Sequence, residues 1–354
     1  MPRKKQPKKL NEFAPEDILA ELRQREGGSA VSAKKKAAAP LAQADTASLV
    51  KALRDSQKLV YGVDDRQDIF QVTDPVVLAR ADSTVSLIDV ARITDNGDGT
   101  STILTTTFGE SQDLCEMERF RNQPTAARCS GFLVAPDLIA TAGHCVNANN
   151  LARNRFVFGF RMINETEARV VIPNDQIFKG IAILTREEIG TGPDYAVVRL
   201  DRPATGRTIL KIRRAGKIAD GQPVYVIGHP SGLPMKYAPG ADVRDNSKTA
   251  FFTANLDTYG GNSGSPVFNE DSGDVEGIMV RGDTDFVRMG NCWVSNVCPT
   301  TGCRGEDCTR TTQFADTVPE TPDEPVGDIE TRVTRLEQSV TDIQVSIKEI
   351  LDEL

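Results

Sequence analysis

The sequence predicts an all-β fold, a barrel or sandwich of many short strands, with segments of a different character at both ends. Short runs of apolar or alternating residues recur between about residue 84 and residue 280, and turn residues separate them. No long helical pattern interrupts these runs, which argues against alternating strands and helices. The chain has 354 residues, enough for one large β domain with flanking segments. No apolar run reaches the ~18 residues that a membrane-spanning helix needs.

The N-terminal segment, residues 1–57, is expected to be basic and partly disordered, with two short helices. Residues 1–40 carry ten Lys and Arg against five Asp and Glu. Helical spacing of apolar residues occurs at 15–26 and 47–56, and Gly27-Gly28 ends the first of these helices. The basic stretch is interpreted as a solvated tail, with contact to an acidic partner as the alternative. No apolar stretch of a secretory signal follows, so a cytoplasmic location is expected, with secretion by a route without a classical signal peptide as the alternative.

Residues 58–314 are expected to form the β domain. Segments 84–93 and 101–108 flank Asp95-Asn-Gly-Asp-Gly99, a loop whose residues tolerate positive φ, so they are expected to pair as a hairpin. Further strands are expected at 132–141, 155–161, 169–172, 195–200, 223–227, 250–256, 266–268 and 275–280.

The C-terminal end predicts a coiled coil after a linker. Residues 315–327 are acidic and rich in proline, and residues 315–354 carry three Lys and Arg against eleven Asp and Glu. A heptad pattern over 328–354 then spaces apolar residues alternately by four and three, at Ile329, Val333, Leu336, Val340, Ile343, Ile347, Ile350 and Leu354. We expect a homo-oligomer, a trimer or dimer, through 329–354; docking of a single helix on the body is the alternative.

Three segments in the β domain carry residues suited to nucleophilic catalysis. An apolar strand leads to Thr141-Ala-Gly-His144-Cys145, Asp194 begins an apolar strand, and Gly260-Gly-Asn-Ser263-Gly-Ser-Pro266 is rich in glycine. A serine hydroxyl needs a neutral imidazole to accept its proton, and a carboxylate to hold that imidazole in the right tautomer. Backbone N–H groups of Gly261 and Ser263 are the candidate donors to the oxyanion. Asp137, Asp175 and Asp201 are the alternatives to Asp194.

The combination resembles the chymotrypsin-like (trypsin-fold) serine peptidases in motif and in the order His144, Asp194, Ser263. The resemblance implies two β-barrels over about residues 58–314, a serine endopeptidase acting on protein or peptide substrates, and a disulfide between Cys129 and Cys145. A non-catalytic binding scaffold on the same fold is the alternative. His229 is interpreted as a loop histidine rather than a second base.

Departures from the family indicate a subtype. Asn262 stands where digestive members have an aspartate that pairs with a new N-terminal amine, which makes activation by one N-terminal cut doubtful. Asn262 and Tyr61-Gly-Val-Asp-Asp-Arg66 resemble the bacterial glutamyl-endopeptidase-like branch, so a bacterial source is expected. That branch places a glutamate-selecting histidine where Met279 stands here. The resemblance implies that substrate binds along Val280, Arg281 and Gly282.

Asp257 lies six residues before Ser263, where trypsin-type members bind a basic P1 side chain. Cleavage after Arg or Lys is therefore a hypothesis, and a turn-capping role for Asp257 is the alternative.

Composition limits the ligands, metal sites and cysteine pairings that are expected. The formal net charge is −8, so nucleic acid is not expected as the main ligand. With two histidines in the chain, a multi-histidine metal site is excluded, and no cofactor or metal is expected. The chain has seven cysteines, so at least one is left without an intramolecular partner. Cys292, Cys298, Cys303 and Cys308 are spaced for a four-thiolate metal site, but disulfides or free thiols are favoured.

Overall fold

The computed structural model describes residues 64–190, 192–282, 285–296, 298 and 303–320. The N-terminal helices expected at 15–26 and 47–56, and the coiled coil expected at 328–354, lie outside the described residues. Two helices, α4 (Pro75–Asp82) and α5 (Phe108–Gln112), occur among the strands. The strands are β1 Gln67–Asp68, β2 Thr84–Asp89, β3 Ile93–Asp95, β4 Thr100–Ile103, β5 Thr106–Thr107, β6 Pro124–Thr125, β7 Cys129–Ala135, β8 Leu138–Thr141, β9 Asn154–Phe158, β10 Val171–Pro173, β11 Ile177–Glu188, β12 Asp194–Leu200, β13 Pro223–Gly228, β14 Lys236–Asp245, β15 Phe251–Ala254, β16 Pro266–Asn269, β17 Val275–Arg281, β18 Phe286–Met289, β19 Cys292–Ser295 and β20 Glu306–Arg310.

The first barrel is a closed ring of antiparallel strands in the order β11-β12-β8-β7-β2-β9. Every residue of β7 and β8 is buried, which explains why both strands are continuous apolar runs rather than alternating ones. The segment expected as one strand at 132–141 is a hairpin, because Pro136-Asp137 forms the turn between β7 and β8. His144 lies three residues beyond the end of β8 in this hairpin.

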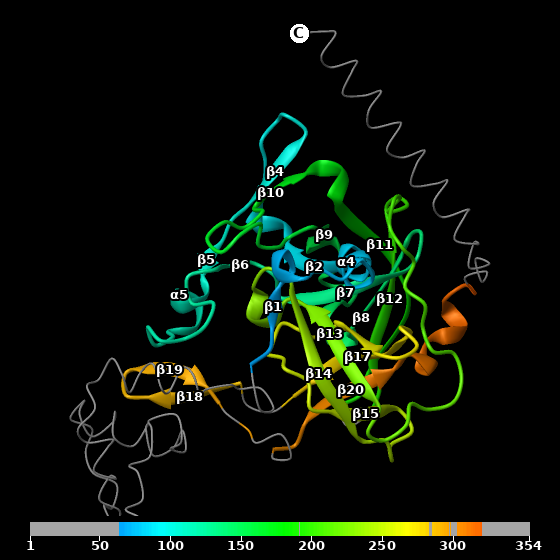
Figure 1. The fold of residues 1–354 in the computed structure, drawn as a ribbon. Helices are drawn as coiled ribbons and strands as arrows, with labels where there is room; N and C mark the ends of the chain where they lie inside the picture. The colour runs from blue at the N-terminus through cyan, green and yellow to red at the C-terminus, as the bar shows by residue number, and fades with distance from the viewer. Residues whose placement is uncertain (1–63, 191, 283–284, 297, 299–302, 321–354) are drawn as a thin grey trace, which may run out of the picture. The chain divides into compact units, whose positions relative to one another are not determined.

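The second barrel contains β14-β13-β16-β17-β20-β15, and a further pairing of β14 with β15 closes the ring. The short β1 adds to the outer side of β14. Figure 1 shows the first barrel in blue to green and the second in yellow-green to orange. The described residues thus form the two-barrel, mostly β fold that the sequence resemblance implied.

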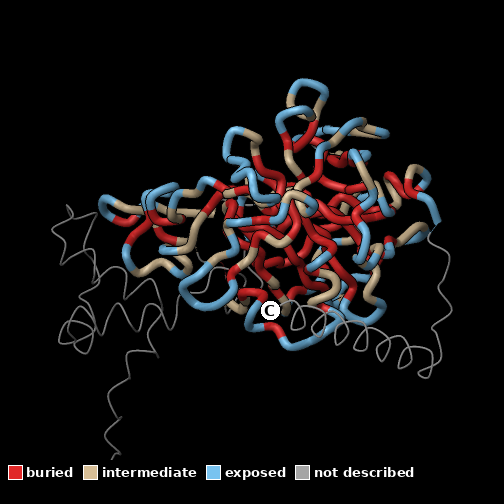
Figure 2. The backbone as a smooth tube through the Cα atoms, turned by 90° about the horizontal axis from the view of Figure 1, so that it is seen from above, coloured by how far each residue is buried: buried red, intermediate tan, exposed pale blue. Residues whose placement is uncertain are grey.

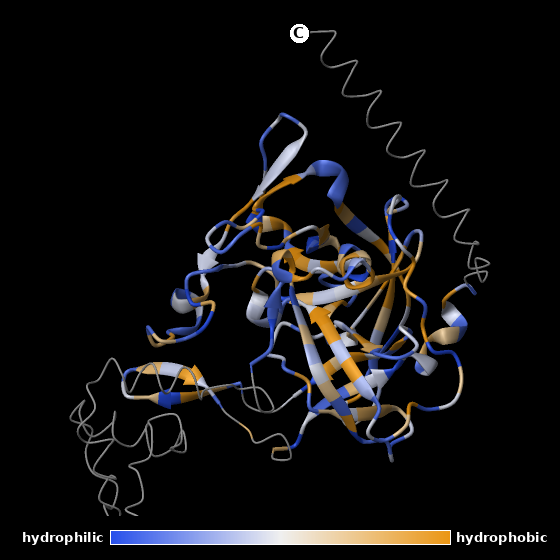
Figure 3. Ribbon diagram, in the orientation of Figure 1, coloured by the Kyte–Doolittle hydropathy of each residue, from blue (hydrophilic) through white to orange (hydrophobic). Residues whose placement is uncertain are grey.

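One core cluster is shared by the two barrels and includes Phe132 and Val197 from the first and Tyr225 and Ile278 from the second. Other buried side chains of the second barrel form a cluster of their own. Figure 2 shows these buried segments gathered in the middle of the described chain, and Figure 3 shows the hydrophobic stretches along the barrel strands. The site described below lies along this junction, because its residues come from both barrels.

The hairpin expected around residues 95–99 is present but shorter than predicted, because β3 pairs with β4 only from Ile93 opposite Ile103 to Asp95 opposite Ser101. Residues 84–93 are not one strand, since β2 ends at Asp89 and the 3₁₀ helix Val90–Arg92 follows. Asp89 starts that 3₁₀ helix by accepting a hydrogen bond from the Ala91 N–H at 2.9 Å, which a strand would not make. The helix α4 was not expected, although Asp74 before Pro75 is a strong start signal.

The β domain extends beyond the expected boundary at residue 314. Two 3₁₀ helices, Thr311–Gln313 and Ala315–Thr317, follow β20, and Ala315 and Val318 are buried in the core. The first compact unit ends at Val318, and a second begins at Pro319. No helix in the described ranges is long and apolar enough to cross a membrane.

Candidate active site

His144 is presented by the 3₁₀ helix Gly143–Cys145, directly after β8. The preceding Gly143 is required by packing, because a Cβ there would overlap the main-chain carbonyl oxygen of Glu187. This close approach brings the helix against β11 and the start of β12. The His144 side chain is 34% exposed, so one edge of its ring faces solvent.

Asp194 begins β12 and lies under His144. Its Oδ2 is 2.7 Å from His144 Nδ1, and its Oδ1 accepts the His144 backbone N–H at 3.1 Å. Burial would raise the pKa of this carboxyl group, but the hydrogen bonds and charge of His144 outweigh burial, so the pKa of Asp194 lies below its ordinary value. An ionised Asp194 fixes Nδ1 as the donor and leaves His144 Nε2 free to accept a proton.

Ser263 lies on a turn of the second barrel, residues 260–265, which we call the nucleophile turn. The Ser130 N–H of β7 donates to the Ser263 carbonyl at 2.8 Å, and Cys145 Sγ lies 3.7 Å from the same oxygen. These contacts bring the turn beside the residue that follows His144. Gly264 has φ +94°, and a Cβ there would overlap the Ser130 carbonyl, so this approach requires glycine.

The backbone N–H groups of Gly261 and Ser263 donate no hydrogen bond to another protein group within the described ranges. The neighbouring carbonyl groups, by contrast, accept backbone hydrogen bonds. Gly260 O accepts one from Ser231 N at 2.5 Å, and Asn262 O accepts one from Ser265 N at 2.8 Å. Both N–H groups predicted as oxyanion donors are therefore available to a ligand.

The expected substrate-binding residues continue β17 away from the nucleophile turn. Gly264 N donates to Met279 O at 2.8 Å, and Met279 N donates to Ser265 O at 3.0 Å, which joins β17 to the turn. Beyond Val280, which is buried, Arg281 and Gly282 line a cavity of about 720 Å³. Its other lining residues are Gly190, Lys248, Phe251, Arg304 and Asp307.

Asp257 lies in an acidic cluster with Asp64 and Asp65 and close to Arg66. Burial, together with these carboxylates, raises the pKa of Asp257 to about 9, and its carboxyl group hydrogen-bonds Asp65. At pH 7 it is therefore mostly protonated. Asp257 is not a lining residue of the cavity beside Gly282 as the structure describes it.

His229 is completely buried, stacked on Phe160 with ring centroids 5.9 Å apart. Its Nδ1 is 3.0 Å from the Leu233 carbonyl. Burial lowers the pKa of His229 to about 4, so the ring is neutral. A loop role agrees with this burial, since no exposed edge is available for proton transfer.

The disulfide Cys129–Cys145 is present, and two further ones join Cys115 to Cys292 and Cys298 to Cys303. These pairings exclude the four-thiolate site that the spacing allowed. Cys308 is the free cysteine among the described residues, and burial raises the pKa of its thiol well above the ordinary value. His144 lies near Cys129 and Cys145, but the disulfide removes both thiolates as metal ligands.

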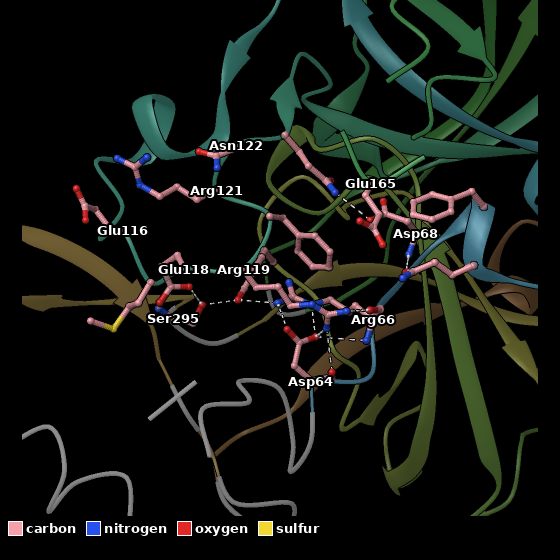
Figure 4. A pocket seen from close by; sticks show the side chains of 16 residues that line it. Asp64, Arg66, Asp68, Glu116, Glu118, Arg119, Arg121, Asn122, Glu165 and Ser295 are labelled. Carbon is pink, nitrogen blue, oxygen red and sulfur yellow. Dashed lines mark hydrogen bonds and ion pairs between the residues drawn. The ribbon is translucent and has the colours of Figure 1, made fainter. Parts of the chain in front are cut away.

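A separate cavity of about 700 Å³ lies between the start of the described chain and the loop that follows α5. Figure 4 shows Arg66 and Arg119 converging on Asp64 at its floor, and Glu118 accepting from Ser295. His144, Asp194 and Ser263 are not among its lining residues. Its lining residues do include Tyr259, which directly precedes the nucleophile turn.

Three residues at the site were missed by sequence reasoning. Ser130 contacts the nucleophile turn, Thr309 Oγ1 accepts the Asp194 N–H at 3.1 Å, and Glu306 lies where a Cβ on Gly282 would be. Ser130 follows Cys129 in the histidine segment, which was a usable signal. Thr309 and Glu306 come from β20, a strand that was not predicted.

The family described as the trypsin-like peptidase domain matches residues 129–278. A glutamyl endopeptidase of Bacillus licheniformis is 26% identical over 161 residues, which is 41% of this chain and 46% of that protein. The chain therefore matches less than half the length of this curated relative.

Two solved structures are similar at lower identity. Human heparin binding protein has a TM-score of 0.44 and 15% identity, covering 74% of this chain and 97% of its own. The Vibrio cholerae VesB protease has a TM-score of 0.44 and 14% identity, covering 74% of this chain and 67% of its own. The family match spans the histidine segment, Asp194 and the nucleophile turn. The similarity to the trypsin-like peptidase domain thus covers these three segments, within residues 129–278 of the 354.

Proposed function

We propose that this protein is a serine endopeptidase that hydrolyses peptide bonds through Ser263, His144 and Asp194. The observation that carries the proposal is the 2.7 Å contact between Asp194 Oδ2 and His144 Nδ1, beside a nucleophile turn with two available N–H groups. Ser263 Oγ would attack the substrate carbonyl carbon while its proton passes to His144 Nε2. The N–H groups of Gly261 and Ser263 would stabilise the resulting oxyanion.

The same residues would complete the reaction. His144, now protonated, returns its proton to the leaving amine, and the C–N bond breaks to leave an acyl ester on Ser263. Water then attacks the ester while His144 accepts its proton. The bond between the acyl carbon and Ser263 Oγ breaks, His144 returns the proton to Ser263 Oγ, and the acid product leaves and ionises. Asp194 stabilises the imidazolium in both steps without accepting the proton.

Cleavage after Arg or Lys is the specificity we propose, and two buried carboxyl groups are candidates to bind the basic side chain. Asp257 has the position implied by the family resemblance, but with a pKa of about 9 it carries little charge at pH 7. Glu306, 6% exposed, lies directly against Gly282 of the expected substrate strand. Selection through Asp257 should therefore strengthen as the pH rises from 7 towards 9, because its ionised fraction increases.

Digestion of a peptide library tests both the activity and this specificity. Wild-type protein is expected to cleave after Arg and Lys, and the variant that removes the selecting carboxyl group, Asp257→Asn or Glu306→Gln, is expected to lose about tenfold to 100-fold in kcat/KM for these residues. The other variant serves as the matched control. Cleavage without a basic preference would reject the specificity but not the activity, and an unchanged preference in both variants would reject these two carboxyl groups as its source.

Self-association through 329–354 is a further part of the proposal, supported by the heptad pattern. Deletion of residues 326–354 is expected to convert a trimer or dimer to a monomer in sedimentation experiments. Hydrolysis of short peptides should stay close to the wild-type rate, because the described site lies within the unit that ends at Val318. An unchanged mass after deletion would contradict this role. Contact of the basic residues 1–40 with an acidic partner is also proposed, on the ground of their charge.

A further inference from the structure

Ser130 is fully buried at the start of β7, and its backbone N–H and its hydroxyl make three hydrogen bonds to the nucleophile turn and to His229. Its N–H donates to Ser263 O at 2.8 Å, and its hydroxyl donates to Gly261 O at 3.3 Å. The hydroxyl oxygen also accepts a hydrogen bond from the backbone N–H of His229 at 3.0 Å. One side chain from the first barrel thus links two segments of the second barrel.

The contact with Gly261 O completes a series of fixed carbonyls. Gly260 O is held by Ser231 N, Asn262 O by Ser265 N, and Ser263 O by Ser130 N. The Gly261 carbonyl lies between the two peptide groups whose N–H donors, those of Gly261 and Ser263, face the proposed oxyanion. Because a peptide unit is planar, holding this carbonyl restricts the rotation of the unit between those donors.

The direction of the hydroxyl proton is also set by its neighbours. A serine hydroxyl has a single hydrogen to donate. Ser130 Oγ accepts the backbone N–H of His229, so its own hydrogen is directed towards Gly261 O. The interaction is buried, where solvent does not compete for the donor and a lost partner is costly.

We infer that Ser130 is a positioning residue for the oxyanion donors: its hydroxyl holds the Gly261–Asn262 peptide so that the N–H groups of Gly261 and Ser263 converge on one point. The inference rests on the proposed peptidase function. It assigns no contact between Ser130 and substrate. Its effect is therefore expected in the transition state, where charge develops on the oxyanion, and not in the binding of uncharged substrate.

The variant Ser130→Ala removes the hydroxyl and keeps the backbone donor to Ser263 O. We expect kcat to fall about tenfold to 100-fold, less than the ~10²–10³ lost with a donor itself, while KM changes little. Affinity for a peptide aldehyde, whose adduct carries the oxyanion, should fall in parallel with kcat. Ser130→Thr, which keeps a hydroxyl on Cβ, should restore most of the rate.

Ser86→Ala is the matched control. Ser86 faces Ser130 in the β2–β7 register, is equally buried, and donates its hydroxyl to the carbonyl of Val157, outside the site. Ser86→Ala should lower the free energy of unfolding by about as much as Ser130→Ala does, and should leave kcat unchanged. If Ser130→Ala does not fold, Ser130→Cys, which fills the same space with only a weak hydrogen-bond donor, tests the same interaction.

An active wild type with an unchanged kcat in Ser130→Ala, or equal losses in Ser130→Ala and Ser86→Ala, would overturn the inference. An inactive wild type would instead reject the proposed function, so the two failures are distinguishable.

Discussion

Replacing Asp194 by asparagine is expected to lower kcat for peptide hydrolysis by about 10⁴-fold. The carboxylate of Asp194 accepts both the His144 Nδ1–H and the His144 backbone N–H. An amide in the same place can keep one acceptor, but its NH₂ group favours the tautomer with the proton on Nε2, which cannot take the Ser263 proton. The loss should appear in kcat and not in KM, as measured by steady-state kinetics on a peptide ester and a peptide amide.

Asp201→Asn is the control for this prediction. Asp201 follows the other end of β12 and was an alternative candidate from the sequence, but its carboxylate accepts the Lys179 N–H at 3.0 Å and pairs with Arg202 at 3.1 Å. Its replacement should leave kcat within about threefold of the wild-type value. Retention of more than about a tenth of the activity in Asp194→Asn would show that Asp194 does not orient the base.

Replacing Asp68 by alanine is expected to reduce the free energy of unfolding by about 3–5 kcal/mol. The Lys236 ammonium group is buried, with 1% side-chain exposure, and contacts Asp68 Oδ1 and Gln123 Oε1. Burial lowers the pKa of Lys236 to about 8 even though Asp68 favours its charged form. Without Asp68, an unpaired charge would remain where β1 pairs with β14.

The pH dependence of stability gives a second readout of this pair. Lys236 has a pKa near 8 in the folded state and about 10.5 when unfolded, so the unfolded state binds more protons between these values. Its contribution to stability therefore rises with pH through this window, and rises more in Asp68→Ala. Urea unfolding of both proteins at pH 7 and pH 9.5 measures this rise in the free energy of unfolding.

Asp82→Ala is the comparison for Asp68→Ala, because the Asp82 side chain is 57% exposed and pairs on the surface with Arg161 at 2.9 Å. The loss there should be within about 1 kcal/mol. Equal losses of unfolding free energy in the two variants would contradict the account that Lys236 is buried and paired with Asp68.

The histidine and serine segments were identifiable from the sequence because each carries its chemistry within a few consecutive residues. Gly143 and Gly264 permit close backbone approaches that other residues would block, so the motif and the geometry are linked. Long-range features were not identifiable. Cys115 pairs with Cys292 across 177 residues, and such pairing depends on the tertiary fold.

Strands β11 and β14 were missed for a physical reason. The burial of β11 is irregular, with two register shifts against β12, and β14 carries Pro239 and Gly240 with a shift against β13. Bulges break the alternation on which a sequence-based prediction relies. Asp257 had the expected sequence position, but its burial with Asp65 depends on the packing of the start of the domain against the second barrel.

The three disulfide bonds bear on location. Disulfides persist in oxidising compartments and are rare in the cytosol. These bonds would persist in an oxidising compartment, and the cytoplasmic location expected from the sequence stays a prediction.

Covalent labelling by a fluorophosphonate tests the central claim most directly, because it requires a nucleophilic serine, its base and the oxyanion donors together. Intact-mass spectrometry of the labelled protein is expected to show one adduct, and peptide mapping is expected to locate it on Ser263. The adduct should be absent in Ser263→Ala and form far more slowly in His144→Ala. An unlabelled wild type, or an adduct that persists in Ser263→Ala, would contradict the catalytic assignment and favour a binding scaffold on the same fold.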